Sequence, residues 1–171
     1  GAATAINGDG FNINGLGTHS NGWPGFHWLS WPDNRTGVSS DVFAKLDLGA
    51  EHVLGNVKVW NYNEDTGHAG AKDMDVLVST DDVTYTLAAS LIDIDLAPTD
   101  ETTPYGEVFA LGGVTARYVM LDVTLGYNPS YAGLSEIRFY EVGEDVEPIV
   151  ADVIAWKGDH FGDWHDARNW A

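Results

Sequence analysis

Cysteine is absent from the 171 residues, so the fold contains no disulfide bond. Basic residues are scarce as well, because eight Lys and Arg stand against 26 Asp and Glu and the formal net charge is −18. A surface with this charge repels phosphate backbones, which argues against a nucleic-acid partner. Apolar runs are short, and none approaches the roughly 20 residues of a membrane-spanning helix. We therefore expect no membrane insertion.

The excess of acidic residues has two interpretations. Acidic side chains keep a protein soluble in a salty or extracellular setting. They also supply the carboxylate oxygens that hard cations such as calcium prefer. Solubility accounts for most of the 26 acids, and a metal site would use two or three of them.

Helical periodicity is nearly absent, and the chain instead alternates apolar and polar residues. In the segment around residue 58, Val57 and Val59 share one face, and Lys58 and Trp60 share the other. A second segment presents Met74, Val76 and Val78 to one side, and later segments repeat the pattern. Many strands without intervening helices predict an all-β fold, namely an antiparallel β-sandwich or jelly roll. We expect Gly112-Gly113 and Tyr127-Asn128-Pro129 to form turns between strands.

Composition changes near residue 142. The stretch Glu141–Pro148 is acidic, contains proline and is typical of a linker. The following tail contains Trp156, Trp164 and Trp170, which cost free energy if they are left in water. The tail either packs on the sandwich or opens a further module, and we favour the second. The predicted organisation is a sandwich over residues 1–142, then a linker and tail over 143–171, within a larger multidomain chain.

Several short segments between Ala5 and Val142 resemble the discoidin, or coagulation-factor type C, family. This family is galactose-binding-domain-like and overlaps structurally with family 32 carbohydrate-binding modules. The segments that carry the resemblance are Asp47-Leu48-Gly49, Val57–Trp60, Val76–Ser79 followed by Tyr85, Ala116–Val119 and Gly133–Ile137. The resemblance implies an eight-stranded jelly roll, usually non-catalytic, that binds its ligands through loops at one end. The tail is similar to Trp-rich repeats of bacterial surface proteins.

The resemblance also implies a structural calcium ion, held by an N-terminal loop and by a Glu of the last strand. Asp9 and Glu136 match those positions, and we expect Asn7 and Thr18 to assist. Calcium takes six to eight oxygens at about 2.3–2.6 Å, and a glycine-rich loop such as Asn7–Gly10 can direct carbonyl oxygens toward an ion. The alternative is a turn held by Asx hydrogen bonds.

Three loops combine aromatic and polar side chains, as sugar recognition requires. A sugar ring needs a flat aromatic surface beneath it and hydrogen-bonding groups around its rim. The resemblance places these loops at one end of the sandwich. Trp28, Trp31 and Trp60 are better candidates for the core than for a binding surface. The expected contacts are Trp23, His27, Asn63, Glu64, His68, Asn128 and Tyr131. Sugar-binding relatives often present an Arg in the second loop, whereas here only Lys72 is nearby, so galactose specificity stays open.

Catalytic motifs are missing: the chain has no His-Glu-x-x-His, Gly-x-Ser-x-Gly or phosphate-binding glycine motif. We therefore predict that it is not an enzyme. The favoured hypothesis is a monomeric, extracellular or surface-bound bacterial module that binds a polysaccharide or other glycan. The alternative is an adhesion or spacer module that contacts protein or a cell surface without a specific sugar pocket.

Overall fold

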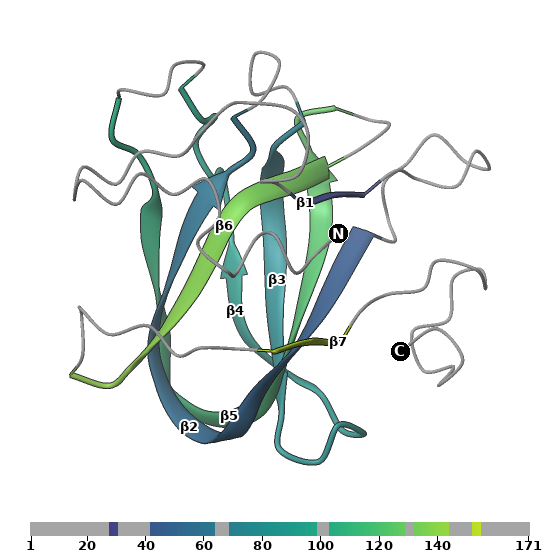
Figure 1. The fold of residues 1–171 in the computed structure, drawn as a ribbon, viewed down its shortest axis with the longest axis vertical. Coiled ribbons are helices and arrows are strands. Elements are labelled where there is room, and N and C mark those ends of the chain that lie inside the picture. The colour runs from purple at the N-terminus through teal and green to yellow at the C-terminus, as the bar shows by residue number, and fades with distance from the viewer. Residues whose placement is uncertain are drawn as a thin grey trace.

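The computed structural model describes residues 28–30, 42–63, 69–98, 103–128, 132–143 and 152–154. Within these ranges the chain forms seven strands and no helix (Figure 1). The strands are β1 (Trp28–Ser30), β2 (Val42–Asn61), β3 (Ala71–Ser79), β4 (Thr86–Leu91), β5 (Glu107–Gly126), β6 (Ala132–Glu141) and β7 (Asp152–Ile154). All named strand pairs are antiparallel, as the alternation of apolar residues predicted.

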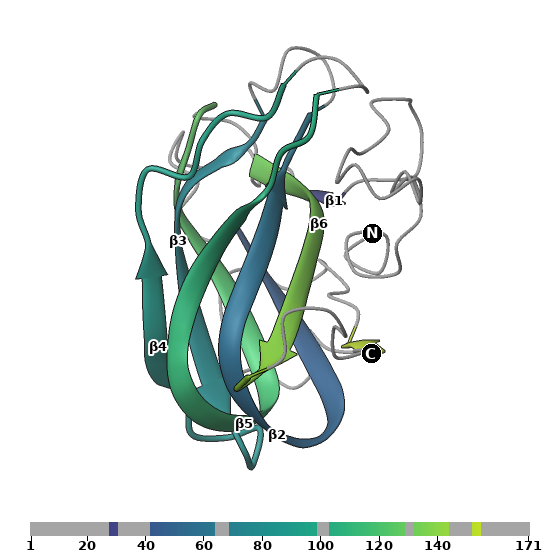
Figure 2. The same cartoon turned by 90° about the vertical axis from the view of Figure 1, so that its left-hand side faces the viewer.

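Two long strands build both layers of the sandwich. The first part of β2, Val42–Asp47, pairs with Tyr118–Val123 of β5, and its later part, Asn56–Val59, pairs with Glu107–Ala110. Between these parts both strands curve round the bottom of the molecule and rise into the other layer (Figure 2). One layer therefore contains β4, β3, the second half of β5, the first half of β2 and β7. The other contains the remaining halves of β5 and β2 with β6 and β1.

Glycines allow these two strands to bend. Gly49 of β2 and Gly112 and Gly113 of β5 have φ values of 82°, 74° and 77°. This left-handed backbone region is open to glycine and unfavourable for most other residues. The register of the β2–β5 pair also shifts between Asp47 and His52, which marks the same bend. Gly112-Gly113 is thus a bend within one strand, and the prediction that it forms a turn between two strands was wrong.

The core lies between the layers and is made by alternate residues of the strands. Val57 and Val59 of β2 and Met74, Val76 and Val78 of β3 are all buried in it. Each buried side chain of this kind stabilises the fold by about 1.5–3 kcal/mol relative to exposure. The predicted inward faces of these two strands are confirmed, and the core gives the loops a rigid base.

The described part of the C-terminal region contacts the sandwich. Glu141 is the last residue of β6, and its Oε1 lies 2.7 Å from Nδ1 of His52 on β2. Asp152–Ile154 pairs with β2 at Lys45–Asp47. These three residues therefore extend the sheet of the sandwich. The domain boundary after residue 142 stays a prediction, and the three tail tryptophans lie outside the described residues.

Candidate functional site

One end of the sandwich brings together segments that are far apart in the sequence. The end of β2, the start of β3, the end of β5 and the start of β6 meet there, opposite the bends (Figure 1). The Tyr127 N–H donates to the Gly70 carbonyl at 3.0 Å, and the Gly133 N–H donates to the Ala69 carbonyl at 2.7 Å. Gly70 and Gly133 also form a parallel bridge. We call this region, residues 61–63, 69–72, 126–128 and 132–136, the loop end.

The side chain of Asn61 joins the elements of the loop end. Its Nδ2 donates to the carbonyls of Ala71 at 2.7 Å and Asp95 at 2.9 Å. Its Oδ1 accepts from the N–H groups of Tyr62 and Ala71, each at 2.9 Å. Asn61 is only 2% exposed, so these bonds replace water entirely. Gly70 packs against the amide, because a Cβ there would lie 2.6 Å from Oδ1 of Asn61.

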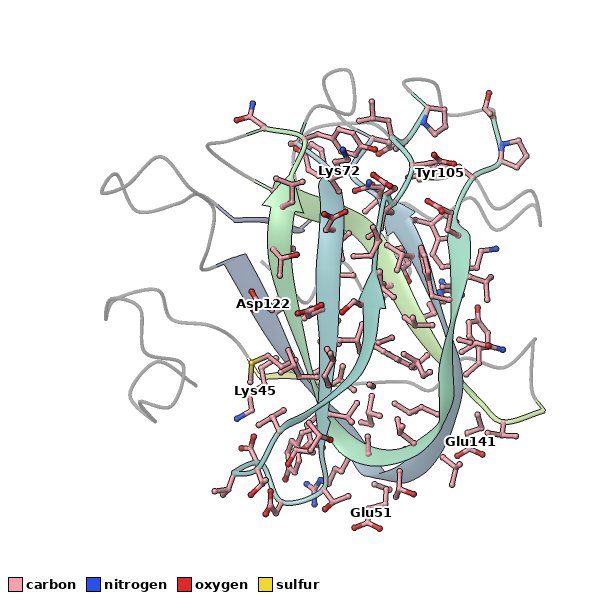
Figure 3. All side chains as sticks on the ribbon, turned by 180° about the vertical axis from the view of Figure 1, so that it is seen from behind. Lys45, Glu51, Lys72, Tyr105, Asp122 and Glu141 are labelled. Atoms are coloured by element: carbon pink, nitrogen blue, oxygen red, sulfur yellow. The ribbon has the colours of Figure 1, made fainter. Side chains whose placement is uncertain are left out.

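Two tyrosines extend this network to the segments around residues 94 and 105. The Tyr127 hydroxyl donates to the Ile94 carbonyl at 2.8 Å, and the Ile94 N–H donates to the Lys72 carbonyl at 2.8 Å. The Tyr105 hydroxyl donates to the Asn61 carbonyl at 3.2 Å. Burial raises the pKa of Tyr105, so its hydroxyl stays protonated as a donor. Lys72 and Tyr105 are both seen at this end in Figure 3.

Two of the predicted sugar contacts lie among the described residues, and both are at the loop end. Asn63 is 1% exposed; its N–H donates to Oγ of Ser135 at 3.3 Å, and that hydroxyl donates to Oδ1 of Asn63 at 3.0 Å. Asn63 thereby fastens the end of β2 to β6. Asn128 follows β5 and is partly buried. Trp23, His27, Glu64, His68 and Tyr131 lie outside the described residues.

Glu136 is the one predicted calcium ligand that the structure describes. It lies opposite Trp60 in the β2–β6 ladder and is completely buried. Its Oε1 accepts a hydrogen bond from Nε of Arg138 at 3.0 Å. A buried carboxylate needs positive charge nearby, and a hard cation with oxygen ligands suits it. Asn7, Asp9 and Thr18 lie outside the described residues, within which no three His, Cys, Asp or Glu side chains gather.

Trp60 is also buried, at 2% exposure, although it belongs to the outward face of β2 with Lys58. The expectation that it is a core-like residue rather than an exposed sugar platform agrees with this burial. Gly106 lies against the indole, because a Cβ there would be 2.8 Å from Nε1 of Trp60. The indole is therefore held by the backbone of the segment that precedes β5.

The sequence interpretation missed Asn61 as the organiser of the loop end. A signal was present, since Asn61 continues the inward face of Val57 and Val59 and a polar residue on such a face must find partners. Tyr105 was missed too, and Tyr127 and Ser135 were named only in a predicted turn and in a segment of the family resemblance, without these hydrogen bonds. Their partners are mostly backbone groups of distant segments, and a sequence alone does not reveal those.

The opposite end of the molecule carries ion pairs and a tight turn. Nε and Nη2 of Arg117 donate to the two carboxylate oxygens of Asp47 at 2.9 and 3.0 Å, and Lys45 pairs with Asp82. The bond from Arg117 holds the pKa of Asp47 below its ordinary value. The carboxylate of Asp81 accepts the N–H groups of Thr84 and Val83 at 2.8 and 2.9 Å, which lower its pKa to about 2. The contacts of Asp81 and Asp82 fix the β3–β4 connection, and the Arg117–Asp47 pair joins β5 to β2.

No family model and no curated protein sequence matches this chain. Among solved structures, the F5/8 type C domain of a Bacteroides fragilis protein aligns over 82% of this chain and 80% of its own, with a TM-score of 0.57 and 15% identity. The module CBM32-1 of a family 31 glycoside hydrolase from Clostridium perfringens aligns over 82% of this chain and 84% of its own, with a TM-score of 0.55 and 15% identity.

A family 89 glycoside hydrolase from Clostridium perfringens aligns over 84% of this chain, with a TM-score of 0.52 and 19% identity. The present chain spans only 13% of the length of that enzyme. These similarities show that the chain has the discoidin-like fold of F5/8 type C domains and family 32 carbohydrate-binding modules. The fold predicted from the sequence is confirmed. Among the described residues no helix is long and apolar enough to cross a membrane.

Proposed function

We propose that the chain is a non-catalytic carbohydrate-binding module that holds a glycan at the loop end. The observation that carries this proposal is the Asn61 network, which fixes β2, β3 and the segment around Asp95 to one another at one end of the sandwich. A rigid base of this kind reduces the entropy that loops lose when they bind a ligand. Similarity to solved carbohydrate-binding modules supports the same assignment.

The expected sugar contacts are connected to this base along the chain. Asn63, Ala69 and Ala132 belong to the loop end, and they are the chain neighbours of Glu64, His68 and Tyr131. His27 precedes Trp28, which pairs with Leu134 at the start of β6. In this proposal the ring of Trp23 stacks on the apolar face of a sugar, with Tyr131 as a second wall. His27, Glu64, His68 and Asn128 bind hydroxyl groups, and the buried Asn63 positions the loop that follows it.

Calcium is the second part of the proposal. Glu136 supplies a buried carboxylate, and Asn7, Asp9 and Thr18 supply the further oxygens. A calcium ion bound there joins the N-terminal loop to β6 and stabilises the folded chain. The module belongs to a secreted or surface protein of a bacterium and acts as a monomeric part of a longer chain.

Affinity electrophoresis on gels that contain single polysaccharides tests the glycan proposal. We expect the wild-type chain to be retarded by at least one polysaccharide, and Trp23→Ala and Asn128→Ala to weaken the retardation. Glu51→Ala is the matched control, because Glu51 is exposed at the bends, far from the loop end (Figure 3). No retardation on any gel would favour the alternative, an adhesion or spacer module.

Thermal unfolding in millimolar calcium and in excess chelator tests the calcium proposal. A ligand at 100 times its Kd stabilises the folded state by about 2.7 kcal/mol. For a chain of this length that raises Tm by about 5–10 °C. Glu136→Gln should abolish the difference between the two conditions, whereas Glu51→Gln should keep it. Equal Tm values for the wild type in calcium and chelator would contradict the proposal.

A further inference from the structure

Lys58 differs from the other basic residues that the structure describes. Lys45, Lys72, Arg117 and Arg138 each pair with an acid, namely Asp82, Asp93, Asp47 and Glu136. Lys58 forms no ion pair with any described residue, although the chain contains 26 acids. Its ammonium group therefore carries positive charge that no carboxylate of the described residues neutralises.

Lys58 lies beside a second cation rather than beside an acid. It stands directly opposite Arg138 in the β2–β6 ladder. Its Nζ lies 4.5 Å from the centre of the Trp60 ring, and Cζ of Arg138 lies 5.7 Å from the same ring. Burial and, after it, the charge of Arg138 lower the pKa of Lys58. Like charges placed directly across strands are destabilising, so this pair costs the folded state some stability.

On the side of β5 the surroundings of the pair are exposed, whereas Trp60 and Glu136 on the same face are buried. Val108 stands opposite Lys58 on β5 and is 60% exposed. Ala110, the next residue of β5 on this face, is exposed as well. Trp60 directly precedes Asn61, so the two cations lie next to the loop end. An anionic group can therefore reach the pair from the side of β5.

We propose that Lys58 and Arg138 form a subsite for an anionic group of the glycan, either the carboxylate of a uronic acid or a sulfate ester. The proposal rests on the proposed function and adds the class of sugar. An ammonium group binds such anions as a point charge, and a guanidinium group adds directed hydrogen bonds. Lys58 contributes more to binding the anionic group than Arg138 does, because Nε of Arg138 already donates a hydrogen bond to Glu136.

The net charge of −18 does not prevent such binding. Charges separated by more than about 8 Å are largely screened at physiological ionic strength. An anionic group in contact with Lys58 lies much closer than about 8 Å to both Lys58 and Arg138, so their attraction for it is not screened. Repulsion from the remaining surface disfavours densely charged polymers, so the fitting glycan carries isolated anionic groups among neutral sugars.

The test compares anionic polysaccharides with neutral counterparts of the same backbone. The affinity for partly methyl-esterified polygalacturonate, compared with the affinity for its fully esterified form, measures the contribution of a carboxylate. The affinity for carrageenan, compared with that for desulfated carrageenan, measures the contribution of a sulfate ester. We expect the wild type to bind one anionic member about tenfold more tightly than its neutral form. Lys58→Gln should remove this preference and leave neutral binding unchanged, and Lys58→Arg should restore it. Arg117→Gln, which removes the same charge at the opposite end, should keep it.

The outcomes separate this inference from the proposed function. Binding of neutral glycans with no preference for their anionic forms would overturn the subsite and leave the glycan proposal intact. A preference that survives in Lys58→Gln would overturn the subsite as well. Absence of binding to every polysaccharide would overturn the proposed function, and the subsite with it.

Discussion

The Asn61 network makes the sharpest prediction about the fold. Replacement by alanine, Asn61→Ala, removes four hydrogen bonds from a site that is 2% exposed. The N–H and carbonyl of Ala71 and the carbonyl of Asp95 lose their partner at once. A buried hydrogen bond contributes about 0.5–1.5 kcal/mol net, so four of them amount to about 4 kcal/mol.

This loss is large compared with the total stability of a domain, which is about 5–15 kcal/mol. For a chain of this length, about 4 kcal/mol corresponds to a decrease in Tm of about 8–16 °C. Urea denaturation measures the free energy of unfolding directly, and an unchanged slope would show that the denatured state is unaffected. Amide exchange adds a local measurement, since the Ala71 N–H that Asn61 protects should exchange faster.

Asn56→Ala is the matched control on the same strand. Asn56 lies on the outward face of β2 between Ala110 and Tyr140 and is only partly buried. Its replacement should change the free energy of unfolding by less than about 0.5 kcal/mol. If Asn61→Ala costs no more than Asn56→Ala, the loop end is not held by this side chain, and the structural argument for a preformed site fails.

Two further predictions concern the backbone and the acidic turn. Gly106→Ala should destabilise the fold by about 2–4 kcal/mol in urea denaturation, because Gly106 has a φ of 109° and its new Cβ would lie 2.8 Å from Nε1 of Trp60. Gly112→Ala meets no atom within 4 Å and should cost only the strain of its positive φ, about 1–2 kcal/mol; equal losses would contradict the packing argument. Asp81 has a folded pKa of about 2, below its ordinary value of 3.8, so its contribution to stability is complete above about pH 4 and is lost as the pH falls toward 2. Asp81→Asn should therefore lower the free energy of unfolding at pH 7 and reduce its loss between pH 4 and 2. If the variant lost as much stability as the wild type between pH 4 and 2, the low pKa of Asp81 would be refuted.

Sequence reasoning predicted the fold better than the site, and particular residues show why. The alternation of Val57 with Val59, and of Met74 with Val76, follows directly from the two-residue period of a strand between core and solvent. The continuation of β2 past Gly49 was not visible, because a glycine in a strand pattern indicates a turn and a bend equally well. The sequence pattern therefore predicted shorter strands in place of β2 and β5, each of which has 20 residues.

The loop end depends on contacts between distant segments. Asn61 bonds to Asp95, and Asn63 bonds to Ser135, over separations of 34 and 72 residues. No local pattern encodes such pairs. Glu136 was singled out only through the family resemblance, and its complete burial came from the structure. The sugar and calcium contacts outside the described residues remain predictions.

The central claim is that a glycan binds at the loop end. A ¹H–¹⁵N chemical-shift titration with a polysaccharide fragment that retards the protein tests it most directly. We predict that the amides of Gly70, Ala71, Tyr127, Asn128 and Gly133 shift with a common Kd, and that Glu51 and Gly112 at the bends do not. Shifts centred on the bends, or on the β4 edge alone, would contradict the account.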